Sequence, residues 1–344
     1  MTALDVTPEQ LEGFQKDFEA MQREIGKVVV GHQEVIDGIL TAAIAGGHTL
    51  LEGVPGVGKT LMVRTLAEVV ELLFQRIQFT PDLMPADILG TYVVMETPQG
   101  RRMFEFQQGP LFNNLILADQ INRGTPKTQS ALLEAMEGQT ISVSSEKFEL
   151  PQPFIVIATQ NPLDMEGTFP LPEPEIDRFL FKLSVNPPGP QQLEEILVRT
   201  TEGEPTPIRT VANGQRLLAM RRIARAVQLP DSVRRLAVSL IAATHPDCPA
   251  APAPVRQFVR YGSSPRGAQA LVLGAKIRAA AETRAEVTVA DLQAVAHAAL
   301  RHRLFLNFEG QSENVRPASL IDSLLEALPG GKKPSVAKDA NLAK

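Results

Sequence analysis

The sequence predicts an α/β fold, in which a mostly parallel sheet is flanked by helices, followed by a small all-α domain. Short apolar strands alternate with amphipathic helical patterns in the first half of the chain, as they do in parallel sheets covered by helices. The segment NPPGP at 186–190 interrupts this alternation, and only helical periodicity follows it. We therefore expect a first domain over 1–186 and a helical domain over 187–327. The polar, low-complexity residues 328–344 are expected to form a disordered tail.

The elements of the first domain can be placed in chain order. A Thr-Pro pair opens an amphipathic helix over about 7–27, because threonine caps a helix and proline suits its first turn. An apolar run at 48–53 enters a glycine-rich loop, and a helical pattern follows at 59–73. Two more runs, 113–119 and 154–159, are rich in Ile, Val and Leu without alternation. That composition is typical of strands buried on both faces.

Two β-hairpins are predicted to project from this layer, and helices are predicted for the rest of the chain. The segment 91–106 places a Pro-Gln-Gly turn between β-prone runs, and 140–150 does the same around Ser-Ser-Glu. Another helix is expected in TPKTQSALLEAME, between the hairpins. The helices expected after the proline-rich linker are 191–201, 212–226, 231–243, 265–283, 288–301 and 317–327.

Composition limits the classes of function that fit. The chain has 344 residues and a net charge of −5, which argues against a protein that coats nucleic acid. Its single cysteine, Cys248, excludes an intramolecular disulfide and fits a reducing compartment. No run approaches 18 consecutive apolar residues, and the N-terminus is acidic and amphipathic. We expect a cytoplasmic protein without membrane insertion and without a nucleic-acid partner.

A phosphate-binding loop is the most specific motif in the sequence. The segment GVPGVGKT at 53–60 fits the pattern G-x-x-x-x-G-K-[ST], with a predicted strand before it and a helix after it. In such a loop, backbone N–H groups surround the phosphates, Lys59 reaches the β- and γ-phosphates, and Thr60 holds magnesium. The sequence thus predicts ATP and Mg²⁺ as cofactors. The predicted nucleotide ligands in this loop are Gly53, Val54, Pro55, Gly56, Val57, Gly58, Lys59, Thr60 and Leu61.

A second magnesium ligand is expected from another strand. Asp119 ends the apolar run LILAD, about 60 residues after the loop, which is where the Walker-B acid of a P-loop protein stands. We therefore predict Thr60 and Asp119 as the protein ligands of Mg²⁺.

Longer stretches of the chain carry a family resemblance. They are VVVGHQEVIDGILTAAIAGGHTLLEGVPGVGKT, RIQFTPDLMPADILG, QQGPLF, LADQINR, KTQSALLEAMEG, IATQNPLDMEGTFPLPEPEIDRFLFKL and SPRGAQAL. Together they resemble the MoxR family of AAA+ ATPases, from about residue 25 to about residue 327. The resemblance implies a P-loop domain, a helical lid and a homo-oligomeric ring, usually a hexamer, with ATP between neighbours. The hairpins near 91–106 and 140–150 match the family's insertions in the second helix and before sensor 1, and would face the ring axis or a partner.

The resemblance also implies roles for several polar residues. Asn161 stands at the sensor-1 position, where a polar side chain orients the attacking water. Arg266, after a predicted Ser-Pro helix start, stands at sensor 2 and would reach the nucleotide phosphates from the lid. Arg178 matches the best position for an arginine finger acting in trans, and Arg123 is the competing candidate. Either finger candidate could instead pair with a carboxylate such as Asp177.

The segment VVVGH at 28–32 resembles the strip beside the adenine. Val30 and Gly31 are its predicted nucleotide contacts, through apolar faces and backbone groups. His32 is not expected to bind a metal, because no second His or Cys lies at ligand spacing.

Gln120 departs from the family pattern, which ordinarily has Glu after the Walker-B Asp. Glutamine keeps the shape but cannot accept a proton at neutral pH, and loss of a positioned base typically costs about 10²–10⁴-fold in rate. We therefore expect ATP binding with strongly reduced hydrolysis. Two explanations remain open. Either the natural protein has Glu and this chain was altered to trap ATP, or the chain is a natural nucleotide-binding scaffold without hydrolysis.

Three classes of machine are compatible with these motifs. The first is an ATPase that remodels or matures partner proteins in a chaperone-like way; the resemblance implies clients with von Willebrand factor A domains. The second is a metal-chelatase motor subunit, which shares the two insertions. The third is a nucleic-acid motor, for which the hairpin segment TPQGRR offers only Arg101 and Arg102. The first class is favoured.

Overall fold

The computed structural model describes residues 6–96, 102–144, 146–162, 167–202 and 206–328. Nearly all of the expected tail lies outside the described residues, and so does the turn expected in the first hairpin.

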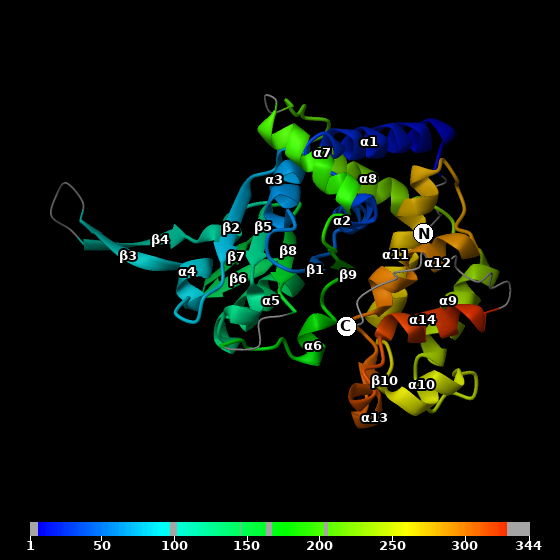
Figure 1. The fold of residues 1–344 in the computed structure, drawn as a ribbon. Coiled ribbons are helices and arrows are strands. Elements are labelled where there is room, and N and C mark those ends of the chain that lie inside the picture. Colours follow the sequence, from blue (N-terminus) through cyan, green and yellow to red (C-terminus); the bar gives the residue numbers. More distant parts are fainter. Residues whose placement is uncertain (1–5, 97–101, 145, 163–166, 203–205, 329–344) are drawn as a thin grey trace.

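A five-stranded parallel sheet forms the centre of the first domain (Figure 1). The runs predicted as buried strands are confirmed as its inner members, and two edge strands were missed. One edge strand, FQRIQ, is mostly polar, and the other is only four residues long. The order across the sheet is β2 (Phe74–Gln78), β5 (Leu115–Asp119), β8 (Ile155–Gln160), β1 (Thr49–Glu52) and β9 (Phe181–Ser184).

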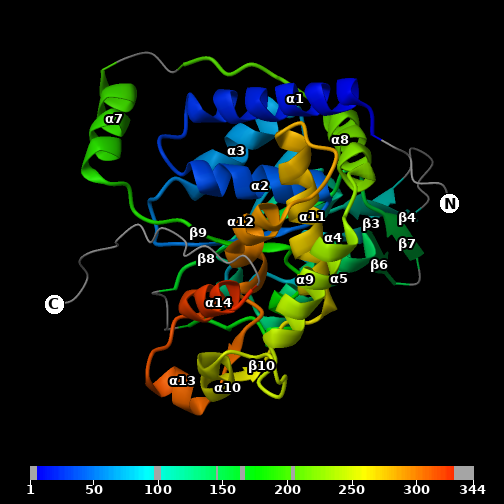
Figure 2. The same cartoon turned by 90° about the vertical axis from the view of Figure 1, so that its right-hand side faces the viewer.

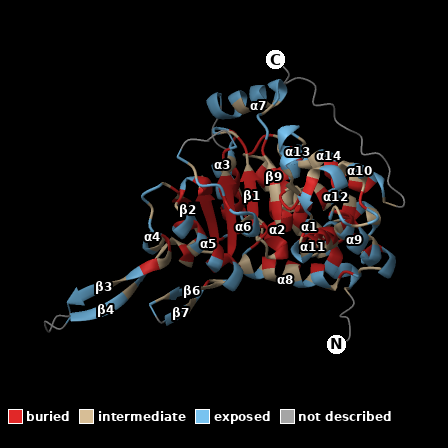
Figure 3. Cartoon of the chain, turned by 90° about the horizontal axis from the view of Figure 1, so that it is seen from below, coloured by how far each residue is buried: buried red, intermediate tan, exposed pale blue. Residues whose placement is uncertain are grey.

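Consecutive apolar residues occupy the inner strands because each of these strands contributes side chains to two hydrophobic clusters. Leu115 and Leu117 belong to a hydrophobic cluster with the N-terminal helices and the lid, whereas Ile116 and Ala118 belong to a second cluster with the helix before the second hairpin. Side chains of a strand alternate between faces, so one strand contributes to both clusters. Figure 3 shows the strands as a buried layer, with exposed residues mainly on the outer parts of the molecule.

Helices cover both faces of the sheet. The first helix, α1 (Pro8–Gly26), was predicted, and Thr7 and Gln10 form its capping box. The helix after the phosphate loop, α3 (Lys59–Val69), is shorter than predicted, because the chain turns at Glu71 with φ of +46°. The remaining elements of this domain are α2 (Gln33–Ala45), α4 (Pro85–Leu89), η1 (Pro110–Phe112), η2 (Ile121–Arg123), α5 (Pro126–Gly138) and α6 (Glu173–Ile176).

Both predicted hairpins are present and they meet at their bases. The first joins β3 (Gly90–Glu96) to β4 (Arg102–Gln108), and the second joins β6 (Thr140–Val143) to β7 (Glu146–Glu149). Phe106 stacks on Phe148 with ring centroids 4.3 Å apart. The outer part of the first hairpin extends well away from the domain (Figures 1 and 3).

The lid is helical, as predicted, and packs on α1 and α2 (Figure 2). Helical periodicity did not predict its short antiparallel pair of strands, nor the two short helices Ala253–Phe258 and Phe308–Ser312. Its elements are α7 (Pro190–Thr201), α8 (Gly214–Ala226), α9 (Asp231–Ala243), α10 (Ala253–Phe258), β10 (Val259–Tyr261), α11 (Pro265–Ala281), α12 (Val289–Leu300), β11 (Phe305–Leu306), α13 (Phe308–Ser312) and α14 (Pro317–Glu326). None of the described helices combines the length and apolar character needed to cross a bilayer.

Candidate functional site

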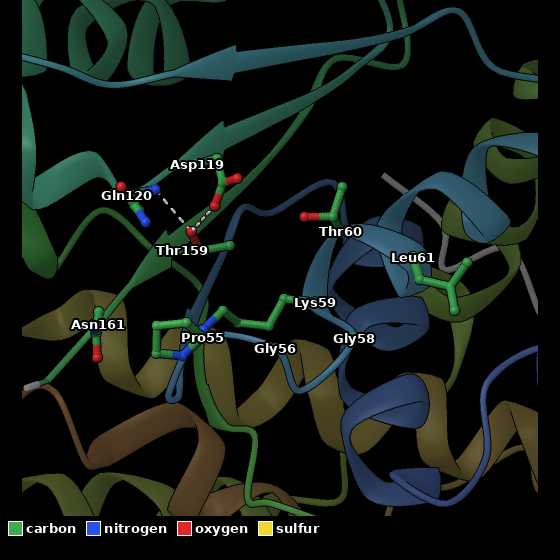
Figure 4. A pocket seen from close by; sticks show the side chains of 10 residues that line it. All are labelled: Pro55, Gly56, Gly58, Lys59, Thr60, Leu61, Asp119, Gln120, Thr159 and Asn161. Carbon is green, nitrogen blue, oxygen red and sulfur yellow. Dashed lines mark hydrogen bonds between the residues drawn. The ribbon is translucent and has the colours of Figure 1, made fainter. Parts of the chain in front are cut away.

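A pocket of about 360 Å³ opens at the carboxyl ends of the inner strands (Figure 4). It joins the phosphate loop to the ends of β5 and β8, which are neighbours in the sheet although far apart in sequence. Crevices at this edge of a parallel sheet are the usual ligand sites of α/β folds. The lining residues are Pro55, Gly56, Gly58, Lys59, Thr60, Leu61, Asp119, Gln120, Thr159 and Asn161.

The phosphate loop has the backbone that its glycines allow. Gly56 and Gly58 both have φ of +84°, a left-handed conformation that strains other residues, although a β-carbon would meet no atom there. Gly58 is also the N-cap of α3, so the positive end of that helix faces the pocket. Lys59 donates to the carbonyls of Gly53 and Val54, the second at 3.0 Å.

Asp119 is buried and already engaged by two donors. The Thr159 hydroxyl donates to its Oδ1 at 2.6 Å, as Figure 4 shows. The guanidinium of Arg76, on the neighbouring strand β2, donates to Oδ2 at 2.9 and 2.6 Å. Neither Thr159 nor Arg76 was predicted. The only sequence signals for them were a hydroxyl residue near the end of a predicted strand, for Thr159, and an arginine within the unpredicted strand β2, for Arg76.

The pocket fits a magnesium ion of the P-loop kind. Thr60 and Asp119 line the same cavity, and Mg²⁺ is usually bound by one or two protein oxygens together with phosphates and water. The described residues contain no cluster of three or more His, Cys, Asp or Glu, so no cage of protein ligands competes with this arrangement.

Gln120 points toward the same pocket from a strained backbone, with φ of +55°. Its N–H donates to the Thr159 hydroxyl at 2.8 Å. Its side-chain oxygen accepts from Gln78 Nε2 at 3.0 Å and from Arg123 Nη1 at 3.4 Å. Both contacts are donors, so a carboxylate at this position would find the same partners.

Asn161, which was predicted at the sensor-1 position, lines the pocket and is buried. Five predicted nucleotide contacts are not among the residues that line the pocket: Val30, Gly31, Gly53, Val54 and Val57. Val30 is buried, and a β-carbon on Gly31 would meet the Gln192 side chain of α7. Burial lowers the pKa of His32, as expected for an imidazole that stays neutral.

Arg178 and Arg266 are also absent from the pocket lining, and they lie together elsewhere. Both pair with Glu137, at the end of α5: Arg266 Nη2 lies 2.7 Å from Oε1, and Arg178 Nη2 lies 3.4 Å from Oε2. Arg266 Nη1 also lies 3.5 Å from Asp177 Oδ2. The predicted helix start is confirmed, since Ser264 caps α11.

A buried arginine completes this group, which we call the arginine cluster: Arg178, Arg266, Arg303, Glu137 and Asp177. Arg303 is 1% exposed and its Nε donates to Asp177 at 2.7 Å. Its other N–H groups donate to backbone carbonyls of residues 177, 179 and 180, at 2.6–3.1 Å. Arg303 thus fixes the backbone around Arg178, a role that no local sequence pattern indicated.

Comparison with known proteins gives a consistent picture. The profile of the "ATPase family associated with various cellular activities (AAA)" matches residues 48–181, and that of the "AAA lid domain" matches 254–324. The chain is 37% identical to Chaperone MoxR1 of Mycobacterium tuberculosis over 95% of this chain and 86% of that protein. It is 39% identical to YeaC of Bacillus subtilis, over 88% and 92% of the two chains.

A solved structure agrees with these relatives. The crystal structure of a protein from Cytophaga hutchinsonii, described as an ATPase, superposes with a TM-score of 0.86 at 35% identity. The match covers 93% of this chain and 97% of that one.

Proposed function

The chain belongs to the MoxR family of AAA+ ATPases, and we propose that it binds ATP with Mg²⁺ and works as a chaperone-like machine on partner proteins. The observation that carries this proposal is the meeting of Lys59, Thr60 and Asp119 in one pocket. Lys59 would leave the carbonyls it contacts now and bind the β- and γ-phosphates. Thr60 and Asp119 would hold the magnesium ion, which supplies charge neutralisation on the phosphate oxygens.

The arginine cluster supports an assembly in which one subunit completes the site of the next. Arg178 and Arg266 do not line the pocket of their own chain, yet their side chains are 28% and 44% exposed. We propose that they contact the γ-phosphate held by a neighbouring subunit, within a homo-oligomeric ring, with a hexamer as the expected size. Arg123, in contrast, contacts Gln120 of its own chain, which favours Arg178 as the finger.

Gln120 would limit the chemical step. A glutamate there would be held by Gln78 and Arg123, as the glutamine oxygen is, and could polarise the attacking water beside Asn161. The amide cannot take the proton, so ATP would be retained in the pocket. The same observation supports the second candidate, a natural ATP-dependent scaffold.

The clients are proposed to be proteins with von Willebrand factor A domains. The hairpins β3–β4 and β6–β7 are the surfaces that we assign to them. The first hairpin exposes several large apolar side chains, and such exposed apolar patches usually mark protein–protein interaction sites. These side chains are Val94, Met95, Met103 and Phe104.

Two measurements on the purified chain test the proposal. Calorimetric titration with Mg-ATP should show binding that Lys59→Ala abolishes and Lys127→Ala, at an exposed lysine on α5, leaves unchanged. Sedimentation with and without Mg-ATP should show a larger assembly in its presence. A chain that stays monomeric and binds no ATP would contradict the proposed function.

A further inference from the structure

Glu137 lies between Arg178 and Arg266, the two arginines that we propose to contact the nucleotide of a neighbouring subunit. It lies in the last turn of α5, and its side chain is 51% exposed. One carboxylate oxygen contacts Arg266 of the lid and the other contacts Arg178 of the first domain. A single acid therefore joins two cations that come from different domains.

The backbones that carry these arginines are fixed by other contacts. Arg303 donates to the carbonyls around Arg178, and the Ser264 hydroxyl donates to Asp177 at 2.8 Å while it caps the helix of Arg266. Glu137 makes no contribution to that backbone network. Its carboxylate contacts both guanidinium groups and so helps to set where they point, together with Asp177, whose Oδ2 lies 3.5 Å from Arg266 Nη1.

Electrostatics predict that a bound triphosphate can displace the Glu137 carboxylate from the two guanidinium groups. Two guanidinium groups side by side repel each other, and the carboxylate between them offsets that repulsion. A triphosphate carries more negative charge than one carboxylate and can bind both groups through several oxygens. Near such a phosphate, the carboxylate of Glu137 would itself be repelled.

We propose that Glu137 is a positioning residue. It holds the Arg178 and Arg266 side chains next to each other and releases them when they bind the γ-phosphate of ATP in a neighbouring subunit. Glu137 then competes with ATP for the two arginines, and it lowers the apparent affinity of the assembly for ATP. The inference rests on the proposed function, because it requires that these arginines act on a neighbour's nucleotide.

The experiment compares Glu137→Gln with Glu134→Gln in the full-length chain. Glu134 lies on the same helix and is exposed, and it forms no ion pair with any described residue. The readout is the Mg-ATP concentration that gives half-maximal assembly in sedimentation. We expect Glu137→Gln to lower this concentration roughly two- to tenfold, since exposed ion pairs are weak individually. Glu134→Gln should leave it unchanged, and high salt should shrink the difference.

A second background distinguishes competition from a general change in structure. When Arg178 and Arg266 are both replaced by alanine, the difference between Glu137→Gln and its parent should vanish. A Glu137→Gln chain that matches the Glu134→Gln control, or that needs more ATP, would overturn the inference while leaving the proposed function intact. If the unaltered chain neither binds ATP nor assembles, both fall together.

Discussion

The phosphate pocket and the arginine cluster differ in how their charged groups are satisfied. In the pocket, polar side chains surround an open cavity that contains space for a ligand. In the cluster, three arginines are already paired with two carboxylates, and one of these arginines is fully buried. The pocket has room for an anion, whereas the arginines of the cluster already have carboxylate partners within their own chain.

The difference suggests that the chain carries two halves of a site that it cannot close alone. Lys59, Thr60 and Asp119 belong to the half that we propose to hold the nucleotide. Arg178 and Arg266 belong to the half that would act on the nucleotide of another chain. Under this proposal, hydrolysis would depend on assembly.

The largest effect is expected from two separate variants, one that disrupts the nucleotide-binding half and one that disrupts the arginine half. With Gln120→Glu present in both, Lys59→Ala should abolish turnover by preventing binding. Arg178→Ala should lower turnover by roughly 10³-fold, by removing charge neutralisation from the neighbour's phosphate. Phosphate release from each chain alone measures both losses.

An equal mixture of these two chains should regain activity. In a mixed ring, the Arg178→Ala chain binds ATP and the Lys59→Ala chain still presents its own Arg178. Two different affinity tags would establish that the chains co-assemble. Mixed rings that remain as inactive as either parent would show that Arg178 does not act in trans.

A smaller effect is expected from the buried ion pair behind the arginines. Asp177→Ala leaves Arg303 buried without its carboxylate and should lower the free energy of unfolding by about 3–5 kcal/mol. Urea denaturation measures this change. Glu173→Ala, at an exposed acid on the adjacent helix, is the control and should change stability by about 0.5 kcal/mol or less. Equal losses in the two variants would mean that the ion pair between Arg303 and Asp177 does not stabilise the backbone around Arg178.

Acid should weaken the scaffold that supports the pocket. Burial lowers the pKa of His48, just before β1, from 6.5 to about 4. Its Nδ1 accepts from the Val156 N–H and its Nε2 donates to the Met136 carbonyl, so the neutral ring is required. The unfolded chain binds a proton between these pH values and the folded chain does not. Stability should therefore fall as pH decreases from about 6.5 to about 4, by on the order of 2–3 kcal/mol.

Comparison of urea midpoints for the unaltered chain and His48→Gln between these pH values measures the effect. The variant should lose less stability over the window. Burial also lowers the pKa of His302, which donates to the Phe179 carbonyl next to Arg178, so part of the decline should persist in the variant. A variant with the same pH dependence as the parent would contradict the assignment to His48.

The phosphate pocket could be predicted from sequence because its signals are local. Gly56 and Gly58 need left-handed backbone, and Asp119 follows four apolar residues in a buried strand. The inner strands and both hairpins were predicted for the same reason. The short edge strand β9 lacked such a signal, and so did the β10–β11 pair within the helical lid.

The arginine cluster could not be predicted from sequence in the same way. Arg303 meets Asp177 across 126 residues, and Arg266 meets Glu137 across 129. Such pairs form only when the lid packs against the first domain. The residue pattern within a single helix or strand therefore cannot predict them. Arg76 is a similar case, because it reaches Asp119 only through the pairing of β2 with β5.

The central claim is that Gln120 limits ATP hydrolysis, and replacing this residue with glutamate tests that claim directly. Gln120→Glu should raise phosphate release from Mg-ATP by roughly 10²–10⁴-fold, since the new carboxylate can polarise the attacking water. The affinity for ATP should change little, because Lys59, Thr60 and Asp119 are untouched. No gain in turnover, in a variant that folds, binds ATP and assembles, would contradict the claim that this site is an ATPase limited by one amide.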